Sequence, residues 1–362
     1  MQSKIVSVRT EIYMIVLFLL GSNSVMGGNW GIGQDAWIAL ILALSVGSVF
    51  VLMYARIISL FPGKNLYYIT EVIFGKRIGK IITALIICYA LYLSTIVIKF
   101  ISEFIKIANL TETPVFPIMV LLVIASAYLT FSGINTLKRW TIFILPGYFL
   151  ILIYLLIIST PEMDFSTILP VFEHNFVDVG TASLKILSTT FAGIILFLTF
   201  ENFIRKNENP YTIYLFGFFI AKIILIVISL TTVMVLGIPV LESSYFPIYM
   251  VARLVGIGDF LSRLEMIIFF NLILASVVKI SICLLAALEG VKNLFNTKKN
   301  ILILFIMSIS ILAIGKLGFS SIMDLLNFLD FYQMPVLSFQ IIMSAMIWIG
   351  AEVKVGKIRV GQ

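Results

Sequence analysis

Ten long apolar segments, joined mostly by short polar connectors, dominate this chain of 362 residues. They lie near residues 11–26, 36–60, 80–105, 115–133, 140–159, 184–204, 211–236, 265–288, 300–318 and 326–350. A helix of roughly 20 apolar residues crosses the hydrocarbon core of a bilayer, so ten crossings use on the order of 200 residues. The sequence therefore predicts an all-α integral membrane protein with ten transmembrane helices, in which residues 1–362 form a single polytopic domain.

The composition agrees with a membrane protein, and the positions of the charges predict its orientation. Hydrophobic residues make up 61% of the chain and charged residues only 12%, which excludes an ordinary soluble protein. Of the 25 Lys and Arg residues, 17 fall on the side of the N-terminus, five on the opposite side and three inside the apolar segments. Because Lys and Arg accumulate in cytoplasmic loops, we expect both termini, including the tail 351–362, in the cytoplasm. The net charge of +7 then reflects topology and not a nucleic-acid partner.

Residues that hold metals or carry out acid-base chemistry are scarce. Cys88 and Cys283 both lie inside apolar segments, and His174 is the only histidine. No spacing typical of a zinc or haem site is present, nor is a paired acid-base constellation. The sequence predicts neither a metal, nor a cofactor, nor an enzymatic activity.

The first apolar segment is interrupted near its expected midplane. After Leu20 the sequence reads Gly21, Ser22, Asn23 and Ser24 before apolar residues resume. Unpaired backbone in hydrocarbon costs several kcal/mol, so a break persists only where it is buried in protein or lines a polar cavity. Taken alone, such a segment is explained better by close helix packing through small residues than by a ligand site.

A second interruption in the corresponding place favours a binding site over simple packing. The segment 184–204 ends in Phe197, Thr199 and Glu201, and Thr199 follows Ser22 by 177 residues, about half the chain. This spacing predicts an inverted repeat of five plus five helices, with repeats at about 10–159 and 184–350 and an outer loop at about 160–183. Broken helices at matching positions of two such halves mark a central site, where freed amides hold a carboxylate and freed carbonyls hold a cation.

Ionisable residues inside the spans are candidates for an ion path or for gating, because burying them is costly. These candidates are Lys99, Glu103, Glu201 and Lys279. Lys99 and Glu103 are four residues apart, so a mutual ion pair is the simpler explanation. Lys222 is expected to extend its charge toward the interface, whereas Lys279 is left open between a cation position in the core and the same behaviour.

Two connectors are longer than usual, at about 160–183 and 237–264. Long ordered loops in compact proteins often act as lids. A helix lying in the membrane interface is an equally good explanation for the amphipathic stretch 249–264. Both are therefore candidate gates only.

Several connector sequences resemble those of one family. They are GQDAW at 33–37, FPGKNL at 61–66, FGKRIGK at 74–80, YFP at 245–247 and GIGDFLSRLE at 256–265. Together with the length and helix number, they are similar to the B subunit of spore germination nutrient receptors, the GerAB-type germination permeases. The resemblance covers essentially the whole chain.

This resemblance implies a fold, a location and partners. The family is related to the amino acid–polyamine–organocation transporters, which implies a LeuT-like fold with broken helices 1 and 6. It implies a multi-pass protein in the lipid of the spore inner membrane that recognises a small nutrient germinant, commonly an amino acid. The implied partners are an A subunit and a C lipoprotein.

The resemblance also implies a ligand pocket between the two breaks and two neighbouring helices. Carried over position by position, its residues are Gly21, Ser22, Asn23, Ser24, Tyr92, Ile96, Phe197, Thr199 and Ser281. Thr199 stands where the related transporters have glycine, so the point at which this helix unwinds is left open. Two functions share this pocket: a receptor that signals through partner subunits, and an autonomous amino acid or cation symporter.

Overall fold

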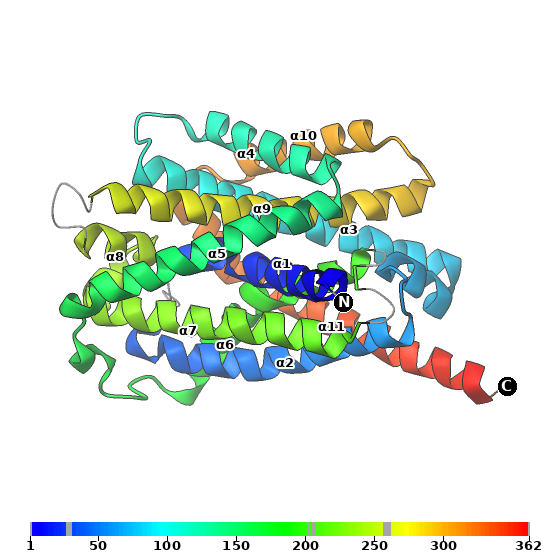
Figure 1. The fold of residues 1–362 in the computed structure, drawn as a ribbon, viewed down its shortest axis with the longest axis horizontal. Coiled ribbons are helices and arrows are strands. Elements are labelled where there is room, and N and C mark those ends of the chain that lie inside the picture. The colour runs from blue at the N-terminus through cyan, green and yellow to red at the C-terminus, as the bar shows by residue number, and fades with distance from the viewer. Residues whose placement is uncertain (1, 27–30, 201–202, 205–207, 256–261, 361–362) are drawn as a thin grey trace.

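The computed structural model describes residues 2–26, 31–200, 203–204, 208–255 and 262–360, and all regular structure in these ranges is helical. The α-helices are α1 (Gln2–Met26), α2 (Ala36–Leu60), α3 (Leu66–Ala108), α4 (Val115–Phe131), α5 (Ile134–Ser159), α6 (Phe176–Ile186), α7 (Pro210–Ser243), α8 (Pro247–Val255), α9 (Ser262–Phe295), α10 (Asn300–Gly318) and α11 (Ile322–Val360). The long helices run side by side along the longest axis of the molecule (Figure 1).

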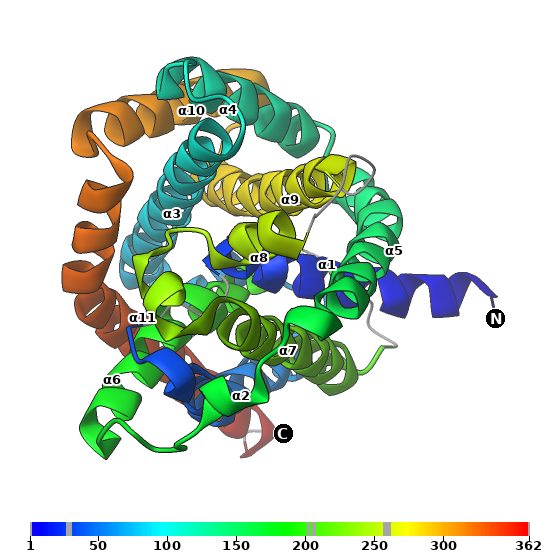
Figure 2. The same cartoon turned by 90° about the vertical axis from the view of Figure 1, so that its left-hand side faces the viewer.

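The number of membrane spans agrees with the sequence. In the described ranges, nine helical segments are long and apolar enough to cross a bilayer, and the 17-residue α4 is a shorter apolar helix beside them. The short α8 belongs to a connector and lies across one end of the bundle (Figure 2). The predicted all-α, ten-span architecture is therefore confirmed.

Helix α1 forms the centre of the bundle. Viewed along the long axis, it lies between α7 and α9, whereas α4 and α10 lie at the periphery (Figure 2). The side chains from Met14 to Leu20 are completely buried, while Leu121 of α4 and Phe305 of α10 are exposed. A helix that is apolar all round is stable only inside protein or lipid, so α1 is the core helix and the outer helices face lipid.

Helix boundaries differ from the hydropathy prediction where a helix extends beyond its apolar part. The predicted span 80–105 belongs to α3, which begins at Leu66 because the side chain of Asn65 caps it by accepting a hydrogen bond from the Tyr68 amide. The motif at 74–80 is therefore helical, with an interruption at Gly75, where φ is 80°. Hydropathy detects burial in lipid and not helix length, so it misses such polar extensions.

Both predicted helix breaks are present, but the second begins earlier than expected. In α1 the break is at Gly21, where φ is −10° and ψ is −107°. After Ile186, α6 continues as a π-helical segment η4 (Leu187–Phe191) and a 3-10 segment η5 (Ala192–Thr199). The irregular region thus begins about ten residues before Phe197, and Glu201 lies outside the described residues.

The first long connector is fastened to the start of α2. The carboxylate of Asp35 is completely buried and accepts hydrogen bonds from the amides of Phe172 and His174, each at 2.9 Å. The Gln34 side chain also donates to Glu173. The loop predicted as a candidate gate is therefore anchored to the start of α2, chiefly by two of its backbone amides that donate to the Asp35 carboxylate.

Candidate functional site

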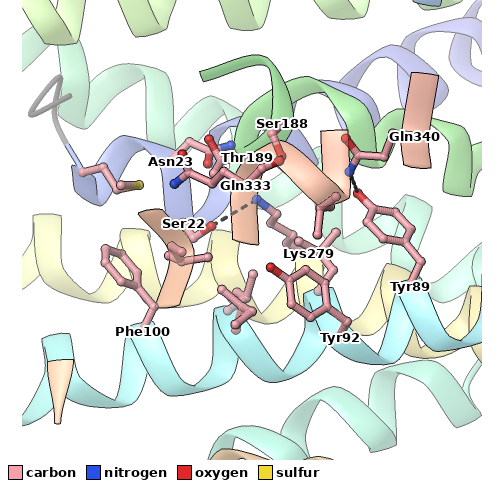
Figure 3. Close-up of a pocket in the computed structure, with 16 residues that line it drawn as sticks. Ser22, Asn23, Tyr89, Tyr92, Phe100, Ser188, Thr189, Lys279, Gln333 and Gln340 are labelled. Carbon is pink, nitrogen blue, oxygen red and sulfur yellow. Dashed lines mark hydrogen bonds between the residues drawn. The ribbon is translucent and has the colours of Figure 1, made fainter. Parts of the chain in front are cut away.

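A small cavity of about 50 Å³ lies at the interruption of α1 (Figure 3). Its walls come from α1, α3, the π-helical segment η4, α9 and α11. The lining residues are Ser22, Asn23, Met26, Tyr89, Tyr92, Leu93, Ile96, Val97, Phe100, Ser188, Thr189, Lys279, Leu329, Gln333, Val336 and Gln340. A space of this size holds a few water molecules or a small ligand.

Lys279 supplies a positive charge to this cavity. Its side chain is only 1% exposed, and its Nζ donates a hydrogen bond to Ser22 Oγ at 3.0 Å (Figure 3). The same ammonium lies 5.5 Å from the centre of the Phe18 ring. Among the residues that the structure describes, no carboxylate forms an ion pair with it. An ammonium buried in this way is a strong site for an anionic group.

The Lys279 side chain of α9 packs directly against Gly21, the residue at which α1 is broken. A Cβ atom on Gly21 would lie 3.1 Å from Cδ and 3.2 Å from Cβ of Lys279. Glycine therefore lets the Lys279 stem pass against the backbone of α1 and reach Ser22. Gly21 itself lies behind the cavity wall and does not line it.

Helix α11 contributes polar groups that the sequence reasoning missed. Gln333 and Gln340 line the cavity, and Gln340 Nε2 donates to the Tyr89 hydroxyl at 2.8 Å. Ser188 Oγ of η4 donates to the backbone carbonyl oxygen of Gln333 at 3.2 Å. A signal was present, because two glutamines two helical turns apart in an apolar span lie on the same helix face.

Five of the residues predicted from the sequence meet at the cavity: Ser22, Asn23, Tyr92, Ile96 and Lys279. Ser24 points elsewhere, since its hydroxyl accepts from Tyr148 Oη at 2.5 Å and donates to the Leu20 carbonyl. Ser281 also lies apart, with its hydroxyl near the carbonyls of Val277 and Ser126.

Phe197 and Thr199 do not line the cavity. Phe197 is buried against Phe18 of α1, with ring centres 5.2 Å apart, and Thr199 Oγ1 donates to the Leu196 carbonyl at 2.6 Å. The α-helical part of this segment ends at Ile186. As a result, the cavity wall that Phe197 was expected to form consists of Ser188 and Thr189.

The other intramembrane charges lie outside the cavity. Lys99 and Glu103 form the expected ion pair at 2.9 Å, with both side chains almost completely buried. Lys222 is partly exposed, with its Nζ 5.5 Å from the Phe219 ring centre. Glu201, the fourth candidate for an ion path, is not among the described residues.

The architecture and the cavity define the class of protein: a multi-pass membrane protein in which broken helices surround a central polar site, the arrangement of secondary transporters. Two solved structures share the fold with a TM-score of 0.71. Mhp1, a nucleobase-cation-symport-1 family transporter with bromovinylhydantoin bound, is 14% identical, and the match covers 93% of this chain and 77% of Mhp1. MhsT in complex with L-phenylalanine is 15% identical, with 96% and 92% covered.

The sequence comparisons identify the family. Residues 5–317 match the family model described as spore germination protein, a spore permease. Spore germination protein KB of Bacillus subtilis (strain 168) is 23% identical over 318 residues, which cover 87% of this chain and 85% of that protein. The chain therefore belongs to the spore germination permease family, as the connector motifs indicated. It is a permease or receptor and not an enzyme.

Proposed function

We propose that this protein is the ligand-binding membrane subunit of a spore germinant receptor and that it binds a small amino acid at the α1 cavity. The observation that carries the proposal is the buried ammonium of Lys279, which faces a small cavity without a carboxylate partner in the described residues. A ligand carboxylate would supply the missing charge. The fold relative MhsT, in complex with L-phenylalanine, supports a ligand of this class.

The cavity divides into a polar end and an apolar wall. Lys279 and Ser22 would hold the carboxylate, with the Asn23 side chain beside them. Ile96 and Phe100 of α3 belong to the apolar wall and would contact the ligand side chain. A hydrophobic pocket distinguishes one methylene group by only about 1–3 kcal/mol, so the wall sets a preference for size.

Ligand binding at this position would change the packing of α1. The cavity borders the break at Gly21, and a ligand that favours one arrangement of the two parts of α1 shifts the population toward it. In the proposed receptor this change passes to an A subunit and a C lipoprotein in the spore inner membrane and triggers germination, with ion release as one outcome. Lys99, Glu103 and Glu201 remain the candidates for the ion path.

An autonomous symporter is the second candidate function. The observation in its favour is the fold shared with Mhp1 and MhsT. Both functions use the same cavity and the same ligand chemistry. They differ in whether binding leads to a signal through partner subunits or to transport of the ligand across the membrane.

Replacing Lys279 by Met tests the ligand site. We expect Lys279→Met to weaken amino-acid binding by at least about 30-fold, because removing one member of a buried charge pair costs about 2 kcal/mol or more. The measurement is equilibrium binding of each of the 20 radiolabelled standard L-amino acids to purified protein in lipid nanodiscs.

The matched control is Lys222→Met, which removes a partly exposed lysine of α7 outside the cavity. It should leave the dissociation constant unchanged. Unchanged binding in Lys279→Met, at a melting temperature equal to that of the wild type, would place the carboxylate site elsewhere.

A further inference from the structure

Two glutamine side chains of α11 face the cavity region with incomplete hydrogen bonding. Gln333 is 6% exposed and Gln340 is 3% exposed. Within the described part of the chain, the Oε1 atom of each has no hydrogen-bond partner. A buried carbonyl oxygen without a donor is uncommon in native proteins and calls for an explanation. Figure 3 shows both glutamines among the lining residues, with Gln340 hydrogen-bonded to Tyr89.

The two glutamines lie on one face of α11. Leu329, Gln333, Val336 and Gln340 all line the cavity, at the spacing of a continuous helix face. Gln340 already donates its Nε2 hydrogen to Tyr89 Oη, which leaves its carbonyl oxygen as an acceptor. Helix α11 therefore carries buried hydrogen-bond acceptors on two residues that line the same cavity as Lys279, whose ammonium is only a donor.

A ligand that satisfies both sides must carry an acceptor and a donor. Lys279 requires an acceptor such as a carboxylate, and the amide oxygens of Gln333 and Gln340 require N–H or O–H groups. An ammonium supplies three donors. Among the described residues no carboxylate lines the cavity, so within this part of the chain the ammonium of a ligand would be held by neutral oxygens.

We propose that Gln333 and Gln340 form the acceptor subsite of the cavity and bind the ammonium group of the ligand. The inference rests on the proposed function, in which Lys279 holds the carboxylate of the same amino acid. The subsite selects amino acids over carboxylic acids that lack the amine.

The same contact would couple the ligand to α11. Farther along this helix, Ser344 shares a hydrogen bond of 2.8 Å with Tyr54 of α2, and Glu352 forms an ion pair of 2.6 Å with Arg56. Pro335 lies between the two glutamines and, having no amide hydrogen, removes one hydrogen bond from the helix. A ligand bound to both Lys279 and the two glutamines would connect α9 to α11. Helix α11 lacks one backbone hydrogen bond at Pro335, beside the cavity, and is bonded to α2 farther along.

The test compares each amino acid with its deaminated acid, for example glycine with acetate, alanine with propionate and valine with 3-methylbutanoate. After the 20 standard L-amino acids have been screened, the wild type should bind its best amino acid at least about 10-fold more tightly than the matching acid. Gln333→Met should reduce this ratio by about 10-fold or more, since the variant loses a hydrogen bond to a charged group. Affinity for the deaminated acid should not change.

Control variants separate this inference from the proposed function. Gln340→Met should reduce the same ratio, and Lys279→Met should weaken both ligands of a pair. Asn327→Leu, on an exposed position of α11, should change neither. Melting temperatures show which variants are folded.

Three results would count against the inference. If Gln333→Met and Gln340→Met leave the ratio unchanged, or weaken acid and amino acid equally, the two oxygens are satisfied by water and the acceptor subsite does not exist. In either case the Lys279 result still supports the proposed site. If the wild type binds none of the amino acids, the proposed function fails and the subsite fails with it.

Discussion

Three lysines inside the predicted spans have side-chain ammonium groups in three different environments. Lys99 is paired with Glu103, Lys222 remains partly exposed, and Lys279 is buried with a hydroxyl as its hydrogen-bond acceptor. The first two arrangements follow from the sequence, through the spacing of four residues between Lys99 and Glu103 and through the expected extension of the long Lys222 side chain toward the interface. The third does not, because the Ser22 partner is 257 positions away. Of these three lysines, Lys279 is the one that lines the described α1 cavity, so its charge is available to a ligand there.

The Lys99–Glu103 pair gives a prediction about stability. Lys99→Met leaves a buried carboxylate without its partner and should destabilise the protein by about 3–5 kcal/mol. The double variant Lys99→Met/Glu103→Met should recover most of this loss, because removing both charges leaves none to compensate. Unfolding in denaturing detergent measures both effects. If the two single substitutions add in the double variant, the two side chains do not interact, and a separate role in an ion path gains support.

At the residue scale, the sequence predicted part of the candidate site. Ser22, Asn23 and Lys279 could be found because a polar residue in an apolar helix is conspicuous. Gln333 was overlooked because the predicted pocket was drawn from the two broken helices and two neighbouring spans, and the span 326–350 was not among them. Phe197 lies outside the cavity because π and 3-10 turns change which residues face the centre, and hydropathy carries no information about such turns.

At the scale of elements, close contacts between helices depend on glycine. Helix α9 carries Gly290 against α3, where an added Cβ would lie 2.5 Å from Ile87 Cγ1 and 2.9 Å from Tyr67 Oη. The Tyr67 hydroxyl also donates to the Ala286 carbonyl at 2.6 Å. The two helices can approach because no side chain separates them at this point.

Gly290→Ala should therefore destabilise the protein by about 1–3 kcal/mol, since it forces α3 and α9 apart or displaces Tyr67. The control is Gly180→Ala in α6, where nothing lies within 4 Å of the added atom. That substitution should be neutral or stabilise by about 0.5–1 kcal/mol, because alanine favours the helix. Thermal unfolding of the two variants in one detergent measures the difference, and equal melting temperatures would contradict the packing argument.

At the scale of the whole molecule, the order and number of helices could be predicted and the relation to partners could not. Apolar length determines how many times the chain crosses a bilayer, and matching breaks in two halves indicated the transporter-like fold. Both chain ends lie toward one end of the molecule (Figure 1), and the cytoplasmic location of that end stays a prediction from the Lys and Arg distribution. Partner recognition depends on the outer surface, where apolar residues suit lipid and protein alike.

The choice between receptor and symporter also belongs to this scale, and uptake by the purified chain decides it. We expect proteoliposomes containing this protein alone to bind the labelled amino acid and not to concentrate it, because a receptor needs only the change of state that binding produces. Proteoliposomes with Lys279→Met provide the background. From spore membranes the tagged protein should copurify with two further subunits, and ligand-triggered ion flux should require them. Concentrative uptake by the wild type alone, abolished in Lys279→Met, would instead establish a symporter that uses the same cavity.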